Sequence, residues 1–334
     1  MRVAYDDMLN EFNRVLLKKG FDDKTALEAA TNFAQTSLDG VYSHGINRFP
    51  RVVSYIDNGI INPNAEPVCE MKFGAMERWN GNYALGNTNA MKAMNRATEL
   101  AKEHGIGVVA IRNTNHWMRG GAFGWQAADQ GCIGICWTNT MPNMPAHGAK
   151  DRKIGNNPFI MSVPRSNGEH VVIDCALSQF SYGKIEEYKL KGKSLPVPGG
   201  YDSEDNITTD PSEIEKTWRV LPVGFWKGSG LSIVFDMIAT ILSGGNSVGD
   251  IGGNMREEAG LSQVLMAIDP TKFSTTSEID AIVDKIIADV KESEPISENG
   301  TIFYPGESSL KTRKENMEHG IPVVEDIWNK ILNM

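Results

Sequence analysis

Two apolar runs separated by an asparagine–glycine turn constrain the fold more than any other feature of this chain. Residues 159–163 and 170–173 have the composition of buried strands, and the turn residues 166–168 lie between them. Asn-Gly flanked by apolar runs predicts a β-hairpin, so at least part of the sheet is antiparallel. A helix over residues 86–104 leads into a buried strand at 108–111, which predicts a sheet covered by helices. The fold class is therefore mixed α/β.

Helices are predicted at both ends of the chain. Apolar residues recur at helical spacing over residues 4–19 and 23–38, and a third helix is expected over residues 44–56. The terminal helices, over residues 307–319 and 324–334, are expected to return to this N-terminal cluster.

Two later segments carry further expectations. Residues 192–215 are rich in Gly, Pro, Asp and Thr and predict a long exposed loop. Residues 231–242 form an almost wholly apolar helix, which we expect to be buried. Gly228 and Gly230 precede it, but Ile233 occupies the third glycine position and no strand leads in. The dinucleotide fingerprint of Rossmann folds therefore fails, and a nucleotide would have to be held in another way.

Composition and charge limit the function classes. The chain has 334 residues, 41% hydrophobic and 22% charged, which suits two domains or one large domain. A net charge of −9 argues against nucleic acid as a partner. No apolar run approaches the ~18 residues of a membrane span, and no signal peptide is expected, because residues 1–7 have no apolar core of the kind a signal peptide carries. The four cysteines form no C-x-x-C pair, so we expect reduced thiols and a cytoplasmic protein.

The segment Gly40–Arg51 contains the first candidate site. We expect Ser43 to cap a helix that begins at His44, with Arg48 one turn further along the same face. The positive end of the helix dipole would lower the pKa of His44 while leaving it able to exchange a proton near neutral pH. Arg48 is suited to bind a carboxylate. The alternative is a surface histidine with an unrelated arginine.

Other polar residues are candidates of the same kind. His116 follows the strand 108–111 at its exit, where ligand sites tend to lie, although it could instead be a structural histidine bonded to the backbone. Lys227 could reach a phosphate or could be an ordinary solvated lysine. No His, Cys, Asp and Glu set has metal-ligand spacing, so no metal site is predicted.

Short motifs spread over nearly the whole chain resemble the malate/L-lactate dehydrogenase family, which is unrelated to the Rossmann-type dehydrogenases. Each motif is weak alone, but together they are highly specific. They are Ser43–Gly45 with Arg48, Arg112–His116, Trp137–Asn139, Gly155–Pro158, Ile173–Asp174, Gly183–Lys184, Thr209–Pro211 and Lys227–Leu231.

The resemblance implies a fold and an assembly. The family has a non-Rossmann, largely antiparallel sheet wrapped by helices, with a separate helical domain built from both chain ends. We therefore expect a helical domain over residues 1–70, joined by 308–334, and a sheet-containing cofactor-binding domain over 71–307. The family binds a nicotinamide dinucleotide in a bent conformation and works as a homodimer.

The resemblance also implies roles for single residues. His44 resembles the proton donor, and Arg48 and His116 are the other expected catalytic residues. NAD, used as NADH, is the expected cofactor, and a carboxylate at Asp174 near the ribose would favour it over NADP. The expected cofactor-binding residues are His170, Val171, Val172, Ile173, Asp174, Cys175, Ala176, Trp226, Lys227, Gly306, Glu307 and Ser308.

The chain departs from the general family pattern at Gly40–Tyr42 and Trp117–Arg119, where it resembles a branch that acts on a sugar acid. We therefore expect NADH-dependent reduction of a small anionic sugar acid at its C2 carbonyl. Arg119 or Tyr42 would bind the sugar-acid tail, with Trp117 lining the pocket, unless this segment is core and Arg119 is a surface cation. The alternative functions are a malate-, lactate- or ureidoglycolate-type dehydrogenase and a non-catalytic binder of small molecules.

Overall fold

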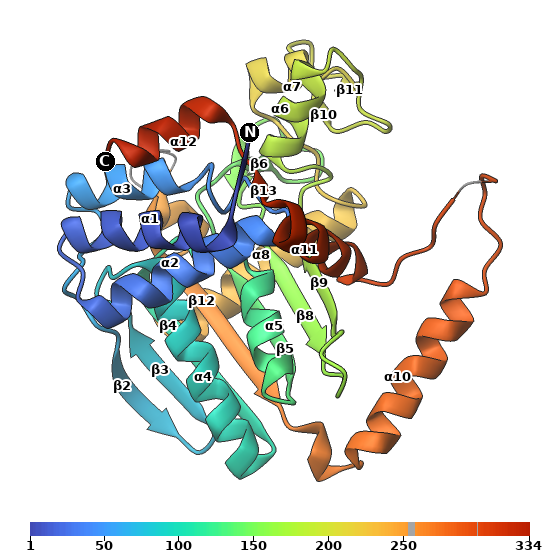
Figure 1. Ribbon diagram of the computed structural model, residues 1–334. Helices are drawn as coiled ribbons and strands as arrows, with labels where there is room; N and C mark the ends of the chain where they lie inside the picture. Colours follow the sequence, from blue (N-terminus) through green and yellow to red (C-terminus); the bar gives the residue numbers. More distant parts are fainter. Residues whose placement is uncertain (253–257, 299) are drawn as a thin grey trace.

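A seven-stranded sheet forms the centre of the computed structural model, which describes residues 1–252, 258–298 and 300–334 (Figure 1). In spatial order its strands are β2 (Val68–Phe73), β3 (Met76–Asn80), β4 (Ile106–Asn115), β12 (Ala259–Ile268), β5 (Ile133–Thr138), β8 (Phe159–Val163) and β9 (Val171–Cys175). β3 and β4 are parallel, and every other neighbouring pair in this sheet is antiparallel. The prediction of a mixed α/β fold with a largely antiparallel sheet is therefore confirmed.

The predicted hairpin lies at one edge of the sheet. β8 and β9 pair with Val163 opposite Val171, and Gly168 in the connecting turn has φ +76°. At the centre, β4 pairs with β12, which comes much later in the chain, and Asn115 lies opposite Ala259. The residues that follow β4 and those that precede β12 therefore meet at the same end of the sheet.

Helices cover both faces of the sheet (Figure 1). α4 (Gly86–His104) and α5 (Gly121–Asp129) share an apolar core with Val109 of β4, whereas α8 (Trp226–Ser243) packs with its neighbour Val108 on the other face. Successive residues of a strand point to opposite faces, so alternate residues of β4 enter alternate cores. The predicted helix over residues 86–104 is confirmed at both of its ends.

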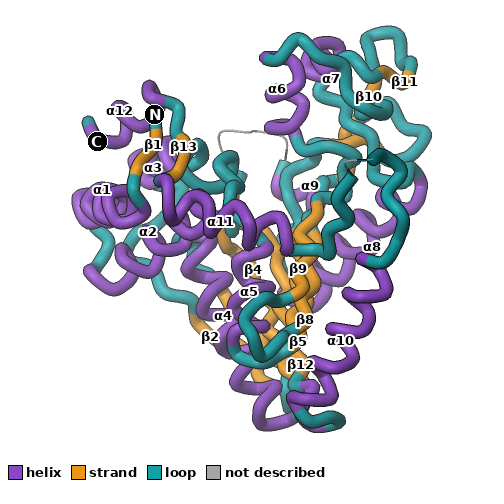
Figure 2. Tube along the Cα trace, turned by 45° about the vertical axis from the view of Figure 1, so that its right-hand side comes forward, coloured by secondary structure: helices purple, strands orange, loops and turns teal. Residues whose placement is uncertain are grey.

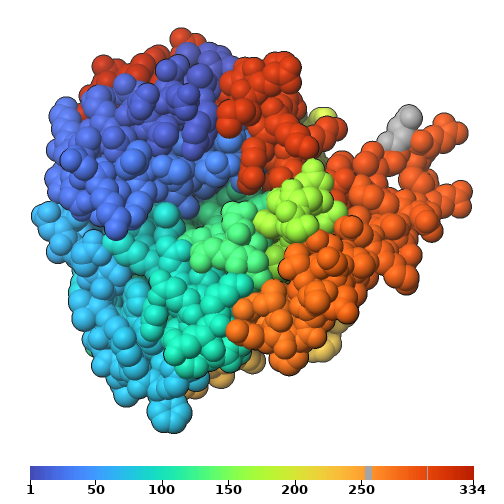
Figure 3. Space-filling view, turned by 60° about the horizontal axis from the view of Figure 1, so that its bottom comes forward, coloured from blue at the N-terminus to red at the C-terminus, as the bar shows by residue number. Residues whose placement is uncertain are grey.

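The two ends of the chain pack together, and Figure 3 shows the blue N-terminal and red C-terminal residues side by side. One apolar core draws on both ends, and a two-residue ladder pairs β1 with β13. The predicted return of the C-terminus to the N-terminal helices is confirmed, whereas the domain division at residue 70 stays a prediction. The elements of this region are β1 (Arg2–Val3), α1 (Tyr5–Lys18), α2 (Asp23–Leu38), α3 (Phe49–Asp57), α11 (Glu307–His319), β13 (Ile321–Pro322) and α12 (Glu325–Leu332).

The segment expected to be a long exposed loop belongs instead to a small lobe with its own apolar core, at the upper right of Figure 1. Leu195 and Ile214 are buried in that core, and their wide spacing in the sequence gives no periodic signal. The elements of the lobe are α6 (Tyr182–Leu190), β10 (Gly200–Tyr201), β11 (Ile207–Thr208) and α7 (Pro211–Thr217).

The remaining elements are short, apart from a helix that projects from the body of the protein (Figures 1 and 2). They are β6 (Met144–Pro145), β7 (Arg152–Ile154), α9 (Val248–Ile251), the 3₁₀ helix η1 (Pro270–Lys272) and the projecting helix α10 (Thr276–Lys291). Among the helices of the described residues, none combines the length and the apolar character needed to cross a bilayer.

The expectation that the apolar helix is buried is wrong for one of its faces. Within α8, Ala239 packs against the sheet, whereas Leu231, Val234, Met237 and Ile241 are 47%, 48%, 56% and 69% exposed. A sheet covers only one side of a helix that lies on it, and a uniformly apolar sequence does not reveal whether a further layer lies outside. The exposed side of α8 is therefore an apolar stripe, a feature typical of a surface that binds another molecule.

Candidate active site

His44 and Arg48 lie in a turn that precedes α3, and not in the helix itself. α3 begins one residue after Arg48, which is its N-cap residue, so the prediction that His44 starts the helix is wrong. Ser43 does not act as the predicted cap of that helix, because its Oγ lies 2.9 Å from Nδ1 of His44. The N–H of Ile46 donates to Oγ of Ser37 in α2 at 2.9 Å. This contact with α2, which is absent from the local sequence, holds the turn in place.

His44 and His116 lie with their rings stacked, the ring centroids 5.9 Å apart and the planes at 25°. Burial lowers the pKa of His44 to about 4, although the carboxylate of Asp174 opposes this shift. Burial also lowers the pKa of His116 well below its ordinary value. The predicted direction for His44 is therefore right, but its main cause is burial rather than a helix dipole.

The proton of the neutral His116 is assigned to Nε2. His116 follows the last residue of β4, and its Nδ1 accepts a hydrogen bond from the N–H of Met118 at 3.0 Å. A neutral imidazole carries one N–H, so the nitrogen that accepts cannot be the one that donates. His116 therefore presents a hydrogen-bond donor, and the backbone contact is compatible with a role in the site.

Arg48 has a partner that the sequence analysis missed. Its Nη2 lies 3.5 Å from Oε2 of Glu258, whose side chain is 9% exposed. Oε1 of Glu258 accepts from the N–H of Met141 at 3.3 Å. Glu258 immediately precedes β12, and the pairing of Ala259 with Asn115 brings it to the end of the sheet where β4 leads into the site. Only this long-range register could have identified it.

Arg119 does not point into a substrate pocket. It is 5% exposed and forms an ion pair with Asp39, which also accepts from Nε and Nη2 of Arg313 at 2.7 and 2.9 Å. Trp117 is 1% exposed, and Asn316 donates to the hydroxyl of Tyr42 at 3.1 Å. The hypothesis that Arg119 binds a substrate tail beside Trp117 is therefore wrong, because a buried carboxylate already neutralises this guanidinium.

The stretch 170–177, which includes the edge strand β9, contacts the segments that precede α11 and α8. The N–H of Val172 donates to the carbonyl of Pro305 at 2.9 Å, and the N–H of Val223 donates to the carbonyl of Leu177 at 2.9 Å. The stretch around Asp174 lies between these two contacts. Backbone groups of residues two apart point to the same side of a strand, so those of Asp174 face the same edge as the N–H of Val172.

The side chain of Asp174 lies near His44 and Arg119. Its Oδ2 accepts from the N–H of Gly121, the first residue of α5, at 2.8 Å and lies 4.0 Å from Nε of Arg119. The same carboxylate opposes the fall in the pKa of His44. Asp174 therefore lies beside His44, the expected proton donor. This position does not favour the expectation that Asp174 lies near the ribose and selects NAD over NADP.

The loop that begins α11 approaches the His44 turn. Ser308 lines a pocket of about 400 Å³ whose other walls are Asp39, Gly40, Val41, Tyr42, Ser309 and Thr312. Gly306 has φ +97°, and a Cβ there would lie 3.1 Å from the backbone nitrogen of Val172. Glu307 is held by an ion pair with Lys291 and by the N–H of Tyr304. The loop therefore packs closely against β9.

The other predicted cofactor residues differ in whether their side chains are exposed or already hydrogen-bonded. Trp226 and Lys227 open α8 on the surface, and Trp226 is 65% exposed. The ring of His170, by contrast, is bonded on both sides: its Nδ1 accepts from the N–H of Arg165 at 3.0 Å, and its Nε2 lies 2.9 Å from Oδ1 of Asp129. Only the backbone of His170 is left for a ligand.

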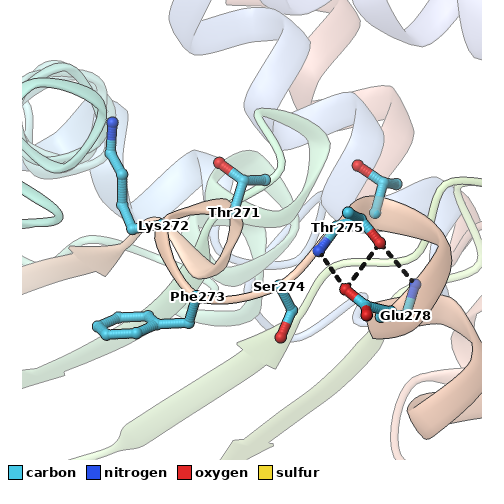
Figure 4. Close-up of a pocket in the computed structure, with 7 residues that line it drawn as sticks. Thr271, Lys272, Phe273, Ser274, Thr275 and Glu278 are labelled. Atoms are coloured by element: carbon cyan, nitrogen blue, oxygen red, sulfur yellow. Dashed lines mark hydrogen bonds between the residues drawn. The ribbon is translucent and has the colours of Figure 1, made fainter.

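A second pocket, of about 410 Å³, lies at the other end of β12 and is lined by residues 271–276 and Glu278 (Figure 4). Oγ1 of Thr275 and the carboxylate of Glu278 form a capping box at the start of α10, so their hydrogen bonds are used within the helix end. β12 starts beside His116 and ends beside this pocket, so the pocket lies about ten residues, or about 30 Å, from the histidines. In the described part of the chain, no three His, Cys, Asp or Glu residues are placed to hold a metal ion.

The chain belongs to the malate/L-lactate dehydrogenase family, whose model matches residues 3–332. It is 48% identical to the 2,3-diketo-L-gulonate reductase of Citrobacter koseri over 331 residues, which cover 99% of both chains. It is 46% identical to the enzyme of the same name from Klebsiella pneumoniae, with the same coverage.

Solved structures agree with this assignment. Malate dehydrogenase from Entamoeba histolytica superposes with a TM-score of 0.93 at 25% identity, covering 100% of this chain and 96% of that one. Sulfolactate dehydrogenase from Methanocaldococcus jannaschii superposes with a TM-score of 0.91 at 30% identity, covering 99% and 95%. The sequence resemblance to the family is therefore confirmed.

Proposed function

We propose that this protein reduces 2,3-diketo-L-gulonate to 3-dehydro-L-gulonate with NADH as the hydride donor. The observation that carries the proposal is the stacked pair of His44 and His116 beside Arg48, in a chain of a dehydrogenase family. The names of relatives at 46–48% identity support the choice of substrate. A site with two imidazoles and a guanidinium also suits a small anionic sugar acid.

His44 is the proposed proton donor to the C2 oxygen. A bound nicotinamide would supply hydride to the C2 carbon. His44 is mostly neutral in the free protein, because burial lowers its pKa to about 4. It must therefore take up a proton from solvent before it can donate one to the C2 oxygen as hydride arrives at the carbon. Nε2–H of His116 can donate to the same oxygen, and Arg48 is proposed to bind the carboxylate.

The residues along β9 fit a dinucleotide held without a Rossmann motif. The edge around Asp174 offers backbone donors and acceptors to an amide, and the hydroxyl of Ser308 and the exposed ring of Trp226 lie on the two flanking segments. We propose NAD rather than NADP on the family branch alone. Titration with NADH and NADPH, followed by quenching of tryptophan fluorescence, tests this choice, and tighter binding of NADPH would refute it.

The activity is tested by NADH oxidation over a panel of 2,3-diketo-L-gulonate, pyruvate, oxaloacetate and oxoglutarate. His44→Ala should lower kcat by about 10²- to 10⁴-fold with NADH binding nearly unchanged, since positioned acid catalysis contributes about that much. Arg48→Lys should mainly raise KM, because lysine lacks the planar fork. A fully active His44→Ala enzyme would rule out its proposed role.

A second candidate is a dehydrogenase of the malate, lactate or ureidoglycolate type. The finding that favours it is the burial of Arg119 with Asp39, which removes the residue expected to bind a sugar-acid tail. The same panel separates the two candidates: preference for a short 2-oxo acid by kcat/KM supports the second one. A non-catalytic binder would oxidise NADH with none of the panel.

We propose that the protein works as a homodimer in the cytoplasm. The exposed apolar stripe of α8 supports the first part, because a second copy would bury it. Met237→Lys should then halve the mass measured by light scattering, whereas Leu27→Lys, at an isolated exposed leucine of α2, should not. A monomeric wild-type protein would contradict the proposal. The cytoplasm is supported by the four unpaired cysteines.

A further inference from the structure

Glu258 joins the active site through Arg48. Its carboxylate is the only acidic partner within ion-pair distance of Arg48 among the described residues, and the two are encoded 210 positions apart. The side chains are 9% and 16% exposed, so neither charge is fully solvated. A buried guanidinium requires a counter-charge, and removing one partner of such a pair is strongly unfavourable.

The pair is also incomplete. Nη2 of Arg48 lies 3.5 Å from Oε2 of Glu258, a long contact, while Nε of Arg48 is buried without a hydrogen-bond partner among the described residues. A guanidinium has five donors in a rigid plane, so a contact at Nη2 limits the directions in which the remaining donors, Nε among them, can point. A buried N–H without a partner is unfavourable, which makes Nε the atom best suited to gain one from a bound carboxylate.

The position of Glu258 is fixed by contacts with residues of the sheet and its loops. Its Oε1 accepts from the N–H of Met141, and the next residue, Ala259, pairs with Asn115, the neighbour of His116. Arg48, by contrast, comes from the turn before α3, in the helical region. The contact between Glu258 and Arg48 therefore connects the helical region to the end of the sheet that carries His116.

We propose that Glu258 is a positioning residue, which holds the guanidinium of Arg48 so that its unpaired donors, Nε among them, meet the carboxylate of the substrate. This inference rests on the proposed function, since it assumes that Arg48 binds that carboxylate. Glu258 touches neither the substrate nor the cofactor in this role. Its effect is therefore exerted through substrate binding and not through the transfer of hydride or proton.

The test compares Glu258→Gln with the wild-type enzyme on pyruvate and on its uncharged methyl ester. KM for pyruvate, or for diketogulonate if that is the better substrate, should rise about 10-fold or more, because a charge-assisted contact is replaced by a weaker one. kcat should stay within about 3-fold, and KM for methyl pyruvate should stay within about 2-fold, as expected for an effect on carboxylate binding alone. An unchanged or lower KM for the acid would overturn the proposal.

A double-mutant cycle and a control separate positioning from general damage. In an Arg48→Gln background, Glu258→Gln should have less than about a 2-fold further effect, because the two act as one unit. Glu77→Gln removes a buried carboxylate that pairs with Arg96, about 20 Å along the sheet from Asn115, and should leave KM unchanged. Independent effects of Glu258 and Arg48 would refute the proposal.

Binding can also be measured without turnover. Oxalate, titrated by calorimetry into the protein with and without NADH, should bind Glu258→Gln about 10-fold more weakly than the wild-type protein. Equal affinities would count against the positioning role. If the wild-type protein reduces none of the 2-oxo acids, the proposed function fails. If the wild-type protein is active and Glu258→Gln has the same KM and the same affinity for oxalate, the proposed function stands and only the positioning role of Glu258 fails.

Discussion

Replacement of Asp39 by asparagine should destabilise the protein more than any surface substitution. Asp39 is 3% exposed and accepts hydrogen bonds from two guanidiniums, those of Arg119 and Arg313. Burial alone would raise the pKa of Asp39, but hydrogen bonds and charge from the two arginines lower it below its ordinary value. The carboxylate is therefore charged at neutral pH, and its loss leaves Arg119, which is 5% exposed, with only the more distant carboxylate of Asp174, 4.0 Å from its Nε.

The magnitude follows from this geometry. Breaking a buried ion pair by removing one partner costs about 3–5 kcal/mol. At about 2–4 °C per kcal/mol for a chain of this size class, the melting temperature of Asp39→Asn should fall by about 10 °C. Asp57→Asn is the matched control, because Asp57 pairs with Lys19 at 2.7 Å but is 51% exposed, and such pairs contribute less than about 1 kcal/mol.

Differential scanning calorimetry at several pH values checks the reasoning. A carboxyl whose pKa is lowered in the folded state stabilises the protein above its unfolded pKa, near 3.8, and loses that contribution as pH falls further. The difference between wild type and Asp39→Asn should therefore be full at pH 7 and shrink below about pH 4. A difference of less than 2 °C at pH 7, or an equal fall for Asp57→Asn, would refute the assignment.

Two further predictions concern the reaction and the cofactor. Because burial lowers the pKa of His44 to about 4, about one molecule in 1,000 carries the proton at pH 7, so kcat/KM for reduction should rise about tenfold per unit as pH falls from 8 to 5; a plateau below pH 6.5 would contradict this. Gly306→Ala should weaken NADH binding measured by fluorescence, because its Cβ would lie 3.1 Å from the nitrogen of Val172. Gly168 also has a positive φ, +76°, but nothing lies within 4 Å of its Cβ position, so Gly168→Ala should leave NADH binding unchanged. If both variants lose NADH affinity equally, the loss in Gly306→Ala comes from backbone strain and not from its contact with Val172.

Local patterns were sufficient where neighbours in sequence decide the structure. The hairpin β8–β9 follows from Asn167-Gly168 between apolar runs, and α4 ends where Gly105 adopts φ +86°. Each depends on a few adjacent residues and on no distant contact. The spacing also placed Arg48 near His44, whereas His116, which follows β4, stacks on His44 from a different element, and no local pattern predicts that contact.

Long-range contacts explain what the sequence could not predict. Glu258 meets Arg48 because β12 inserts between β4 and β5. Asp39, which follows α2, meets Arg119, which precedes α5, although the two are 80 residues apart. A lone arginine in a sequence is equally consistent with substrate binding and with a buried pair. The choice depends on whether the fold brings a carboxylate to it, which no local pattern encodes.

The burial of Arg119 changes where the substrate tail should be recognised. The small lobe approaches the other side of the His44 turn: a Cβ on Gly183, in the first turn of α6, would lie 3.5 Å from Cβ of Ser43, which is an ordinary van der Waals contact. We therefore predict that Gly183→Ala is tolerated, whereas Gly183→Val, with two more methyl groups directed at Ser43, lowers kcat/KM for diketogulonate at least about 10-fold more than for pyruvate, since a longer substrate needs that space. The measurement is the ratio of the two kcat/KM values in each variant. An equal fall for both substrates would mean that the lobe supports His44 and leaves recognition of the tail to other residues.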